Sequence, residues 1–387
     1  MSEVTEHLCH AAATVAAPGV RSPPPAFAWS ARRIALAPML AHLHGIAPLL
    51  SLATTGFPPD LTDVFARHRA LSDARALRLV ALRDGFIAEA RARGAAAIPL
   101  KGARACDTLY AEPGLRPMAD LDFLCAAADL EACRTAATRL GLVALDVTER
   151  HAVFGAAGAR VVAMLAEHPD NPIKVEMHTR LVERFFGDGV DVTPAMRRPG
   201  GQIGHAIHAL LHASQHAMAR TLRFCQMIDI GLMFQRFDRS DWQSLEDALL
   251  PFDMGWVYAP LALAQTYFPG VVDAGALARA RRAAPWLARR AVWRISDLSY
   301  SAIGDGGLRV RLRWAQRPVQ ALGAQTGAIL AAAARRDPGK STELAPAFAP
   351  ERRPVWGRML AWISGRGIRP ISARLIELAP AAWEPPS

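Results

Sequence analysis

The sequence predicts an α+β protein, with a small mixed β-sheet between an N-terminal helical cap and a large C-terminal helical region. Short apolar runs between residues 95 and 178 end at glycine or at charged residues, as strands do. Long segments of helical periodicity precede and follow these runs. The chain has 387 residues, of which 51% are hydrophobic. This length is enough for two domains, or for one large domain with appendages.

The first quarter of the chain is expected to form the helical cap. Residues 1–27 are rich in alanine and proline and are predicted to be disordered. Residues 28–94 are predicted to be the cap, with two short helices between 29 and 52 and amphipathic helix between 61 and 93. The aliphatic side chains available for a core face of the last segment are Leu71, Leu77, Leu79, Leu82 and Ile87.

Residues 95–200 are predicted to form the sheet and most of the candidate site. The predicted strands are 96–100, 119–125, 143–147, 161–165 and 173–178. Apolar residues recur at helical spacing between 129 and 140, which predicts a helix there. Gly141 then stands where a left-handed cap would end that helix.

The remainder is expected to be helical. In residues 201–335, prolines separate segments of helical length. Residues 336–387 are predicted to be a linker and tail, because prolines and a glycine gather between 336 and 355. No transmembrane segment is expected, since histidines and prolines interrupt the apolar stretch 34–57.

The charge and the cysteines narrow the choice of partners and compartment. The net charge of +10 favours an anionic partner, which could be a nucleotide, a nucleic acid or an acidic membrane surface. Nucleic acid is the less expected of these, because aromatic residues do not alternate with the arginine clusters. The five cysteines are odd in number and include no Cys-x-x-Cys pair. They are predicted to be buried thiols in a reducing compartment, the cytoplasm.

Two aspartates on one predicted strand offer half of a metal site. In Asp120-Leu-Asp122-Phe123, alternation along the strand projects both carboxylates to one face and turns Leu121 and Phe123 to the other. The two carboxylates would repel each other unless a hard cation such as Mg²⁺ (or Mn²⁺) lay between them. Surface strands also produce such triplets by chance.

A lysine and a glycine follow the preceding strand. The run Ile98-Pro-Leu breaks at Lys101-Gly102, where glycine would permit close approach of a phosphate and lysine would supply a charge. Lys101 is one of only three lysines in the chain, the others being Lys174 and Lys340. Arg116 lies just before the aspartate strand, and the presence of Lys101-Gly102 and Arg116 together argues against a chance triplet.

A later strand carries a third carboxylate. In Lys174-Val-Glu176-Met-His178, the three polar side chains share one face. If this strand lies beside the aspartate strand, Glu176 completes a set of three metal ligands that could support in-line displacement on a triphosphate. The alternative is that Glu176 and His178 line a solvated face of the sheet.

Four histidines are spaced to lie along one side of a helix, at His205, His208, His212 and His216. A zinc protease is excluded, because His212-Ala-Ser-Gln-His216 lacks the glutamate that activates water. A structural zinc pair would need further ligands. The favoured interpretation is that these histidines join helices to the sheet or line the cleft near bound phosphate. Arg223 and Asp229 are expected to be partners in a buried polar network, the alternative being a surface ion pair that contributes little.

Residues 98–124, with Lys101-Gly102 and Arg116-Pro-Met-Ala-Asp120-Leu-Asp122-Phe, resemble the bacterial family of uncharacterised nucleotidyltransferases within the DNA polymerase beta-like superfamily. The resemblance extends over residues 29–240. It includes His44-Gly45, Val175-Glu176-Met-His178 and a helical signature of His212, His216, Arg223 and Asp229. It implies Asp120, Asp122 and Glu176 as catalytic metal ligands, and Lys101, Gly102 and Arg116 as phosphate contacts. His178, His212 and His216 are expected to border the nucleotide.

The resemblance implies an enzyme that uses Mg²⁺ (or Mn²⁺) and a nucleoside triphosphate. The expected reaction is transfer of a nucleoside monophosphate, AMP from ATP, to a hydroxyl or phosphate of a small molecule, peptide or protein. One alternative is a catalytically inactive module that binds nucleotide for regulation or interaction. Another is a transferase directed at nucleic acid.

Overall fold

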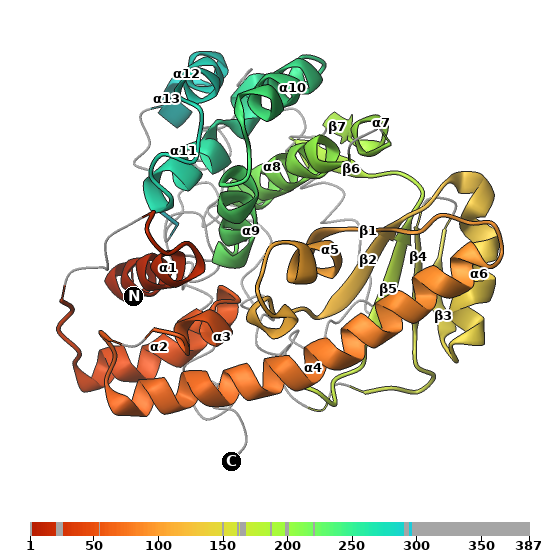
Figure 1. Ribbon diagram of the computed structural model, residues 1–387, viewed down its shortest axis with the longest axis horizontal. Helices are drawn as coiled ribbons and strands as arrows, with labels where there is room; N and C mark the ends of the chain where they lie inside the picture. Colours follow the sequence, from red (N-terminus) through yellow and green to blue (C-terminus); the bar gives the residue numbers. More distant parts are fainter. Residues whose placement is uncertain are drawn as a thin grey trace, which may run out of the picture.

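The computed structural model has an α+β architecture (Figure 1). The structure describes residues 2–289, apart from 21–25, 54, 149–150, 161, 163–167, 186–187, 198–200 and 220, together with residues 294 and 295. The predicted linker and tail, 336–387, therefore lie outside the described residues. So do residues 296–335 of the predicted helical domain.

The N-terminal region consists of helices, and it begins earlier than predicted. Residues 2–16 form a helix although residues 1–27 were expected to be disordered. Alanine favours helix, and Val4, Leu8 and Cys9 are almost fully buried on one side of it. Burial against helices from later in the sequence thus stabilises this helix. The N-terminal helices are α1 (Ser2–Ala16), α2 (Ala31–Leu43), α3 (Ala47–Leu50) and α4 (Pro59–Arg91).

Helix α4 runs along the cap and the sheet and links them (Figure 1). Its buried positions recur every three or four residues, but several of them are polar, including His68, Arg75 and Arg83. Arg75 donates hydrogen bonds to backbone carbonyl oxygens of Met118 and Asn171. The expectation that Leu77 belongs to the core face was wrong, since this side chain is 75% exposed.

Five strands form one mixed sheet in the order β1-β2-β5-β4-β3. Strands β2 and β5 are parallel, and the other neighbours are antiparallel. Helices α5 (Lys101–Thr108) and α6 (Leu130–Arg139) flank the sheet, and 3-10 turns η1 (Pro113–Leu115) and η2 (Ala127–Asp129) precede β2 and α6. The strands are β1 (Ile98–Pro99), β2 (Asp120–Leu124), β3 (Val143–Val147), β4 (His151–Gly155) and β5 (Lys174–His178).

Most of the predicted strands are present. Gly141 has a φ of +77° directly after α6, which confirms the predicted left-handed cap. The strand expected at 161–165 falls on residues of which only 162 is described. Strand β4 was not predicted, nor was the two-stranded sheet of β6 (Val182–Phe185) and β7 (Asp188–Asp191).

The C-terminal region is helical, as predicted, up to the last described residues. No helix in the described part of the chain is both long and apolar enough to cross a membrane. All five cysteines are buried and form no disulfide. The elements are α7 (Thr193–Met196), α8 (Gln202–Ala219), α9 (Phe224–Phe234), α10 (Arg239–Leu249), η3 (Met254–Val257), α11 (Tyr258–Tyr267), α12 (Ala274–Ala283) and α13 (Trp286–Arg289).

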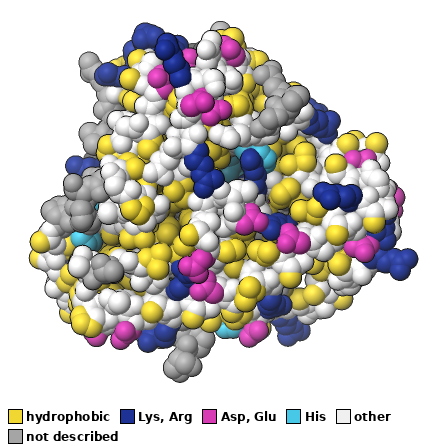
Figure 2. All heavy atoms as spheres, viewed as in Figure 1, with side chains coloured by type: hydrophobic (Ala, Val, Ile, Leu, Met, Phe, Trp, Pro, Cys, Tyr) yellow, Lys and Arg dark blue, Asp and Glu magenta, His cyan; other side chains and the backbone are white. Residues whose placement is uncertain are grey.

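Two hydrophobic cores support this arrangement. One lies between the sheet, α5, α6 and the second half of α4. The other joins α1, α2, α3 and the start of α4 to the C-terminal helices, so the predicted cap and the predicted helical domain share a core. Basic and histidine side chains gather around a hollow near the centre of the face in Figure 2. The candidate site lies where the elements from the two cores meet.

Candidate active site

The site is built on the parallel pair β2 and β5. Asp122 lies opposite Glu176 in the strand register, and Asp120 lies opposite Lys174. Side chains at paired positions of neighbouring strands project from the same face of a sheet. The strand of Glu176 therefore does lie beside the aspartate strand, and Asp120, Asp122 and Glu176 share one face.

Asp122 is the central carboxylate of this face. Its Oδ1 atom accepts a hydrogen bond from Lys101 Nζ at 3.0 Å and lies 3.1 Å from His178 Nε2. Burial raises the pKa of Asp122, but the Lys101 ammonium and the His178 imidazole more than offset this and hold that pKa below its ordinary value. Asp122 is thus a buried, ionised group with two nitrogen partners.

Asp120 and Glu176 add negative charge beside it. Burial, together with the nearby carboxylates of Asp122 and Glu176, raises the pKa of Asp120 to about 6. Glu176 Oε2 faces His151 Nε2 of β4 at 3.4 Å, and the rings of His151 and His178 are tilted against each other with centroids 4.8 Å apart. A hard divalent cation would relieve the repulsion among these carboxylates, and oxygen ligands of this kind suit Mg²⁺. The chemistry of these side chains suits Mg²⁺, while the described side chains whose ligand atoms lie within 4.8 Å of one another on this face are His151, Glu176 and His178.

Lys101 reaches Asp122 from the first residue of α5. It is the only described residue other than glycine with a positive φ, +46°. This left-handed conformation is unfavourable for a side chain that carries a Cβ, and such strain is often found at functional sites. The backbone N–H of Leu100 donates to the carbonyl oxygen of Asp122 at 2.9 Å, which fixes the start of α5 beside the carboxylates.

Gly102 has a packing role that the sequence did not reveal. A Cβ added at Gly102 would lie 2.8 Å from Cγ of Met118, closer than real contacts allow. Its φ is not in the left-handed region, in contrast to that of Lys101. The absence of a side chain at Gly102 therefore lets α5 approach the segment before β2.

Arg116 occupies a buried ion pair. Its Nε and Nη2 atoms donate to the Asp229 carboxylate of α9, with Nη2 to Oδ2 at 2.8 Å, and Nη1 donates to the carbonyl oxygen of Pro117. Tyr110 donates a further hydrogen bond to Asp229 Oδ1 at 2.7 Å. Any contact between Arg116 and phosphate, which stays a prediction, would have to use the guanidinium N–H groups that these bonds leave over.

Asp229 and Arg223 are not partners of each other, contrary to the sequence-based expectation. Arg223 donates to the backbone carbonyl oxygens of His42 and Leu43, at 3.2 and 2.8 Å. Gly45 has a φ of +64°, and a Cβ there would lie 2.9 Å from Arg223 Nη2. Arg223 therefore connects the N-terminal cap to the start of α9. Arg223 and Gly45 are both among the residues on which the family resemblance rests.

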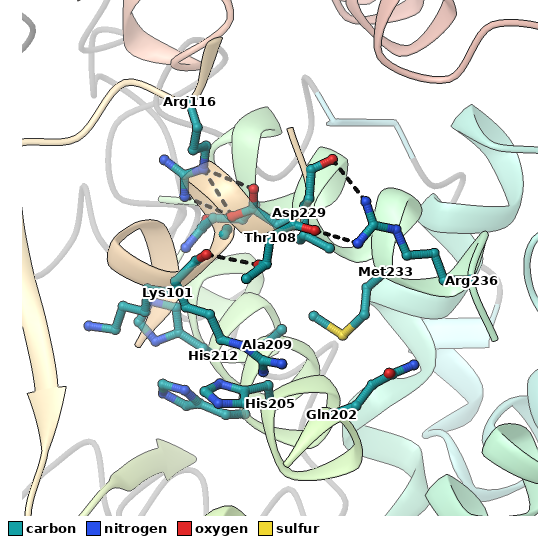
Figure 3. A pocket seen from close by; sticks show the side chains of 15 residues that line it. Lys101, Thr108, Arg116, Gln202, His205, Ala209, His212, Asp229, Met233 and Arg236 are labelled. Atoms are coloured by element: carbon teal, nitrogen blue, oxygen red, sulfur yellow. Dashed lines mark hydrogen bonds and ion pairs between the residues drawn. The ribbon is translucent and has the colours of Figure 1, made fainter. Parts of the chain in front are cut away.

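A cavity of about 140 Å³ opens beside Lys101, between α5, α8 and α9 (Figure 3). Its wall includes His205 and His212 of α8, and Met233 and Arg236 at the end of α9. Arg236 is held in place by hydrogen bonds to the backbone of Thr108 and Leu109. The wall thus combines the cationic side chains of Lys101 and Arg236 with apolar side chains and the Asp229 carboxylate, and the cations favour an anion.

The four histidines of α8 do not act as one group. His212 Nδ1 lies 3.1 Å from Glu183 Oε1, and His208 Nε2 lies 3.4 Å from the same oxygen. His216 Nδ1 contacts Thr221 Oγ1 at 2.7 Å and is not part of the cavity wall. Burial raises the pKa of Glu183, but the neighbouring imidazoles of His208 and His212 lower it by more. The pKa therefore lies below its ordinary value, and this buried glutamate is ionised.

His151 and Glu183 are the polar residues of this region that sequence reasoning missed. Each belongs to a strand that was not predicted. The short apolar run Ala152-Val-Phe154, which ends at Gly155, is the signal in the sequence that could have identified β4. Glu183 is identified only by the fold, because β6 is four residues long.

Comparison with known proteins places the chain in a family. A family model described as uncharacterised nucleotidyltransferase matches residues 30–253, which include the cap, the sheet, α8 and α9. No curated protein and no solved structure matches the chain with significant similarity. The family match supports transferase activity of the nucleotidyltransferase class in general. The chain belongs to the uncharacterised nucleotidyltransferase family.

Proposed function

We propose that the protein transfers a nucleoside monophosphate, AMP from ATP, to a hydroxyl or phosphate group of an acceptor. The observation that carries this proposal is the shared face of Asp120, Asp122 and Glu176, with the Lys101 ammonium 3.0 Å from Asp122. Three carboxylates gathered beside a lysine at a helix start are more than the binding of a nucleotide requires.

Asp120, Asp122 and Glu176 would hold Mg²⁺ (or Mn²⁺). When bound, this ion supplies positive charge that offsets the charge of the triphosphate and of the departing pyrophosphate. Lys101 adds a further cation at the rim, and α5 begins there without a side-chain cap, so its first N–H groups favour an anion. These features suit the triphosphate.

The reaction is an in-line displacement at the α-phosphorus. The acceptor oxygen forms the new bond to phosphorus while the bond to the pyrophosphate oxygen breaks. The proton of an acceptor hydroxyl passes to one of the carboxylates of this face.

Binding of nucleotide without turnover is the second candidate function. The Lys101 to Asp122 ion pair favours it, because in the free protein this contact occupies a carboxylate that a metal would need. In the catalytic proposal, Lys101 moves from Asp122 to phosphate when metal and nucleotide enter. Nucleotide binding is common to both functions, and only transfer separates them.

Nucleotide and metal should stabilise the folded protein together. A ligand that binds only the folded state adds RT ln(1 + [L]/Kd) to the free energy of unfolding, about 2.7 kcal/mol at 100 times Kd. ATP with Mg²⁺ should therefore raise the melting temperature, and ATP with a chelator should raise it much less. Thermal scans with each nucleoside triphosphate measure this. The absence of any shift at millimolar ligand would contradict both candidate functions.

Replacement of Lys101 should weaken nucleotide binding. A hydrogen bond to a charged group contributes about 1.5–3 kcal/mol, so Lys101→Ala should raise the Kd for ATP by about 10- to 100-fold. Lys101→Arg should restore only part of the affinity, because the planar guanidinium needs a different geometry. Arg139→Ala, at an exposed cation of α6 on the opposite side of the sheet from the carboxylates, is the control and should leave the Kd nearly unchanged. Equal effects of the two alanine variants would show that only general charge matters.

A further inference from the structure

A second group of metal-ligating side chains lies apart from the three carboxylates. It consists of Glu183 on β6 and of His208 and His212 on α8. The two histidines are four residues apart, so they lie on the same face of the helix, one turn from each other. Strand β6 packs against α8, which brings Glu183 to this face. Two distant segments thus contribute the three side chains.

The geometry of this group is compact. One ligand atom from each side chain lies within 4.8 Å of the other two. Glu183 Oε1 is 3.1 Å from His212 Nδ1 and 3.4 Å from His208 Nε2. Zinc binds nitrogen and carboxylate oxygen at about 2.0–2.2 Å, and two ligands of a tetrahedral site are therefore about 3.3 Å apart. The two distances already match this spacing.

His208 is a second, independent observation that points to a ligand at this group. Its side chain is 3% exposed, and its Nε2 atom is buried without a hydrogen-bond partner. The nearby Glu183 oxygen does not supply a hydrogen bond of acceptable geometry. A buried imidazole nitrogen is normally satisfied, because an unpaired polar atom costs about 1–3 kcal/mol. A metal ion bound to Nε2 would satisfy it.

We propose that Glu183, His208 and His212 bind a divalent transition metal, with zinc as the expected ion. Two imidazoles and one carboxylate are a ligand set of open zinc sites, in which a fourth position remains for water or substrate. His208 and His212 both line the cavity beside Lys101, so the fourth position faces that cavity. His212 then acts as a metal ligand, in place of its predicted contact with nucleotide.

The proposed site differs in chemistry from the carboxylate face. Asp120, Asp122 and Glu176 offer oxygen, which suits a hard cation, whereas His208 and His212 offer imidazole nitrogen, which suits zinc. Lys101 contacts Asp122 of the carboxylate face, with Nζ 3.0 Å from Oδ1. The zinc site does not depend on the proposed nucleotidyl transfer. If no metal binds, the three residues form a polar contact that fastens β6 to α8.

Metal titration of the full chain, prepared without a histidine tag, tests the proposal. Calorimetry with Zn²⁺ in excess Mg²⁺ should give one ion per chain. His212→Gln and Glu183→Gln should each weaken binding by about 10²-fold or more, since even loss of an outer-shell partner costs about 10- to 100-fold. His205→Gln, one helical turn before His208 on α8, is the matched control and should bind Zn²⁺ as the wild type does. Asp122→Asn should also retain Zn²⁺.

Two measurements on the wild type keep the test decisive if a variant fails to fold. Co²⁺ should give the intense visible absorption of a tetrahedral site, and Zn²⁺ should raise the melting temperature. Absence of stoichiometric Zn²⁺ binding would overturn the proposal, as would a weak octahedral Co²⁺ spectrum. So would unchanged binding in folded His212→Gln, or loss of binding in Asp122→Asn.

Discussion

Asp122→Asn should lower nucleotidyl transfer by about 10²-fold or more, while the protein stays folded. Asp122 is the buried centre of the carboxylate face and holds both Lys101 and His178. The amide keeps the size of the side chain but removes the charge that a metal ligand and a lysine partner require. Transfer of label from α-labelled ATP, measured alongside the melting temperature, gives both quantities.

The matched control for this variant is Asp146→Asn. Asp146 lies on β3 of the same sheet, and its side chain is exposed. The same chemical change there should leave transfer within about twofold of the wild type, because surface substitutions away from a site have small effects. If Asp122→Asn keeps full activity, the carboxylate face is not the reaction centre.

Asp229→Ala should destabilise the protein by about 3–5 kcal/mol, the largest stability loss that we expect from a single substitution. It leaves the buried guanidinium of Arg116 without its counter-charge and the Tyr110 hydroxyl without its acceptor. Removal of one partner of a buried ion pair is costly because the other charge remains out of water. Chemical denaturation at neutral pH measures the free energy of unfolding.

An exposed ion pair provides the comparison. Glu89 and Arg93 are four residues apart near the end of α4 and form a partly exposed pair, so Glu89→Ala should cost no more than about 0.5 kcal/mol. The double variant Arg116→Met with Asp229→Leu should recover much of the loss, because two apolar side chains need no charge compensation. A cost below about 1 kcal/mol for Asp229→Ala would contradict a buried, tightly coupled pair.

Sequence alternation was enough to predict much of the sheet and of its polar face. Asp120 and Asp122 could be assigned to one side of a strand because side chains alternate with a period of two residues. The sequence alone did not decide whether this strand pairs with the strand of Glu176. In the fold the two strands are parallel neighbours. Long-range pairing cannot be read from local periodicity.

The features that the sequence did not reveal depend on tertiary contacts. The first helix has an alanine-rich composition that fits disorder equally well. Burial of Leu8 and Cys9 against other helices stabilises the helical state. Of the aliphatic side chains expected on the core face of α4, only Leu77 is exposed, but the buried Arg75 and Arg83, which hydrogen-bond to backbone carbonyl oxygens, were not predicted. Arg116 meets Asp229 across more than 100 residues of chain, so its partner could not be predicted from spacing.

The most direct test of the proposed reaction is the fate of label from ATP labelled at either the α- or the γ-phosphorus. Purified protein would be incubated with Mg²⁺ and a fractionated cell extract as the source of acceptor. We expect the α-label to enter an acceptor with release of pyrophosphate, and we expect Asp122→Asn to abolish this. Transfer of the γ-label would contradict nucleotidyl transfer. So would tight binding of ATP with no transfer of either label to any fraction, which would leave nucleotide binding as the function of this face.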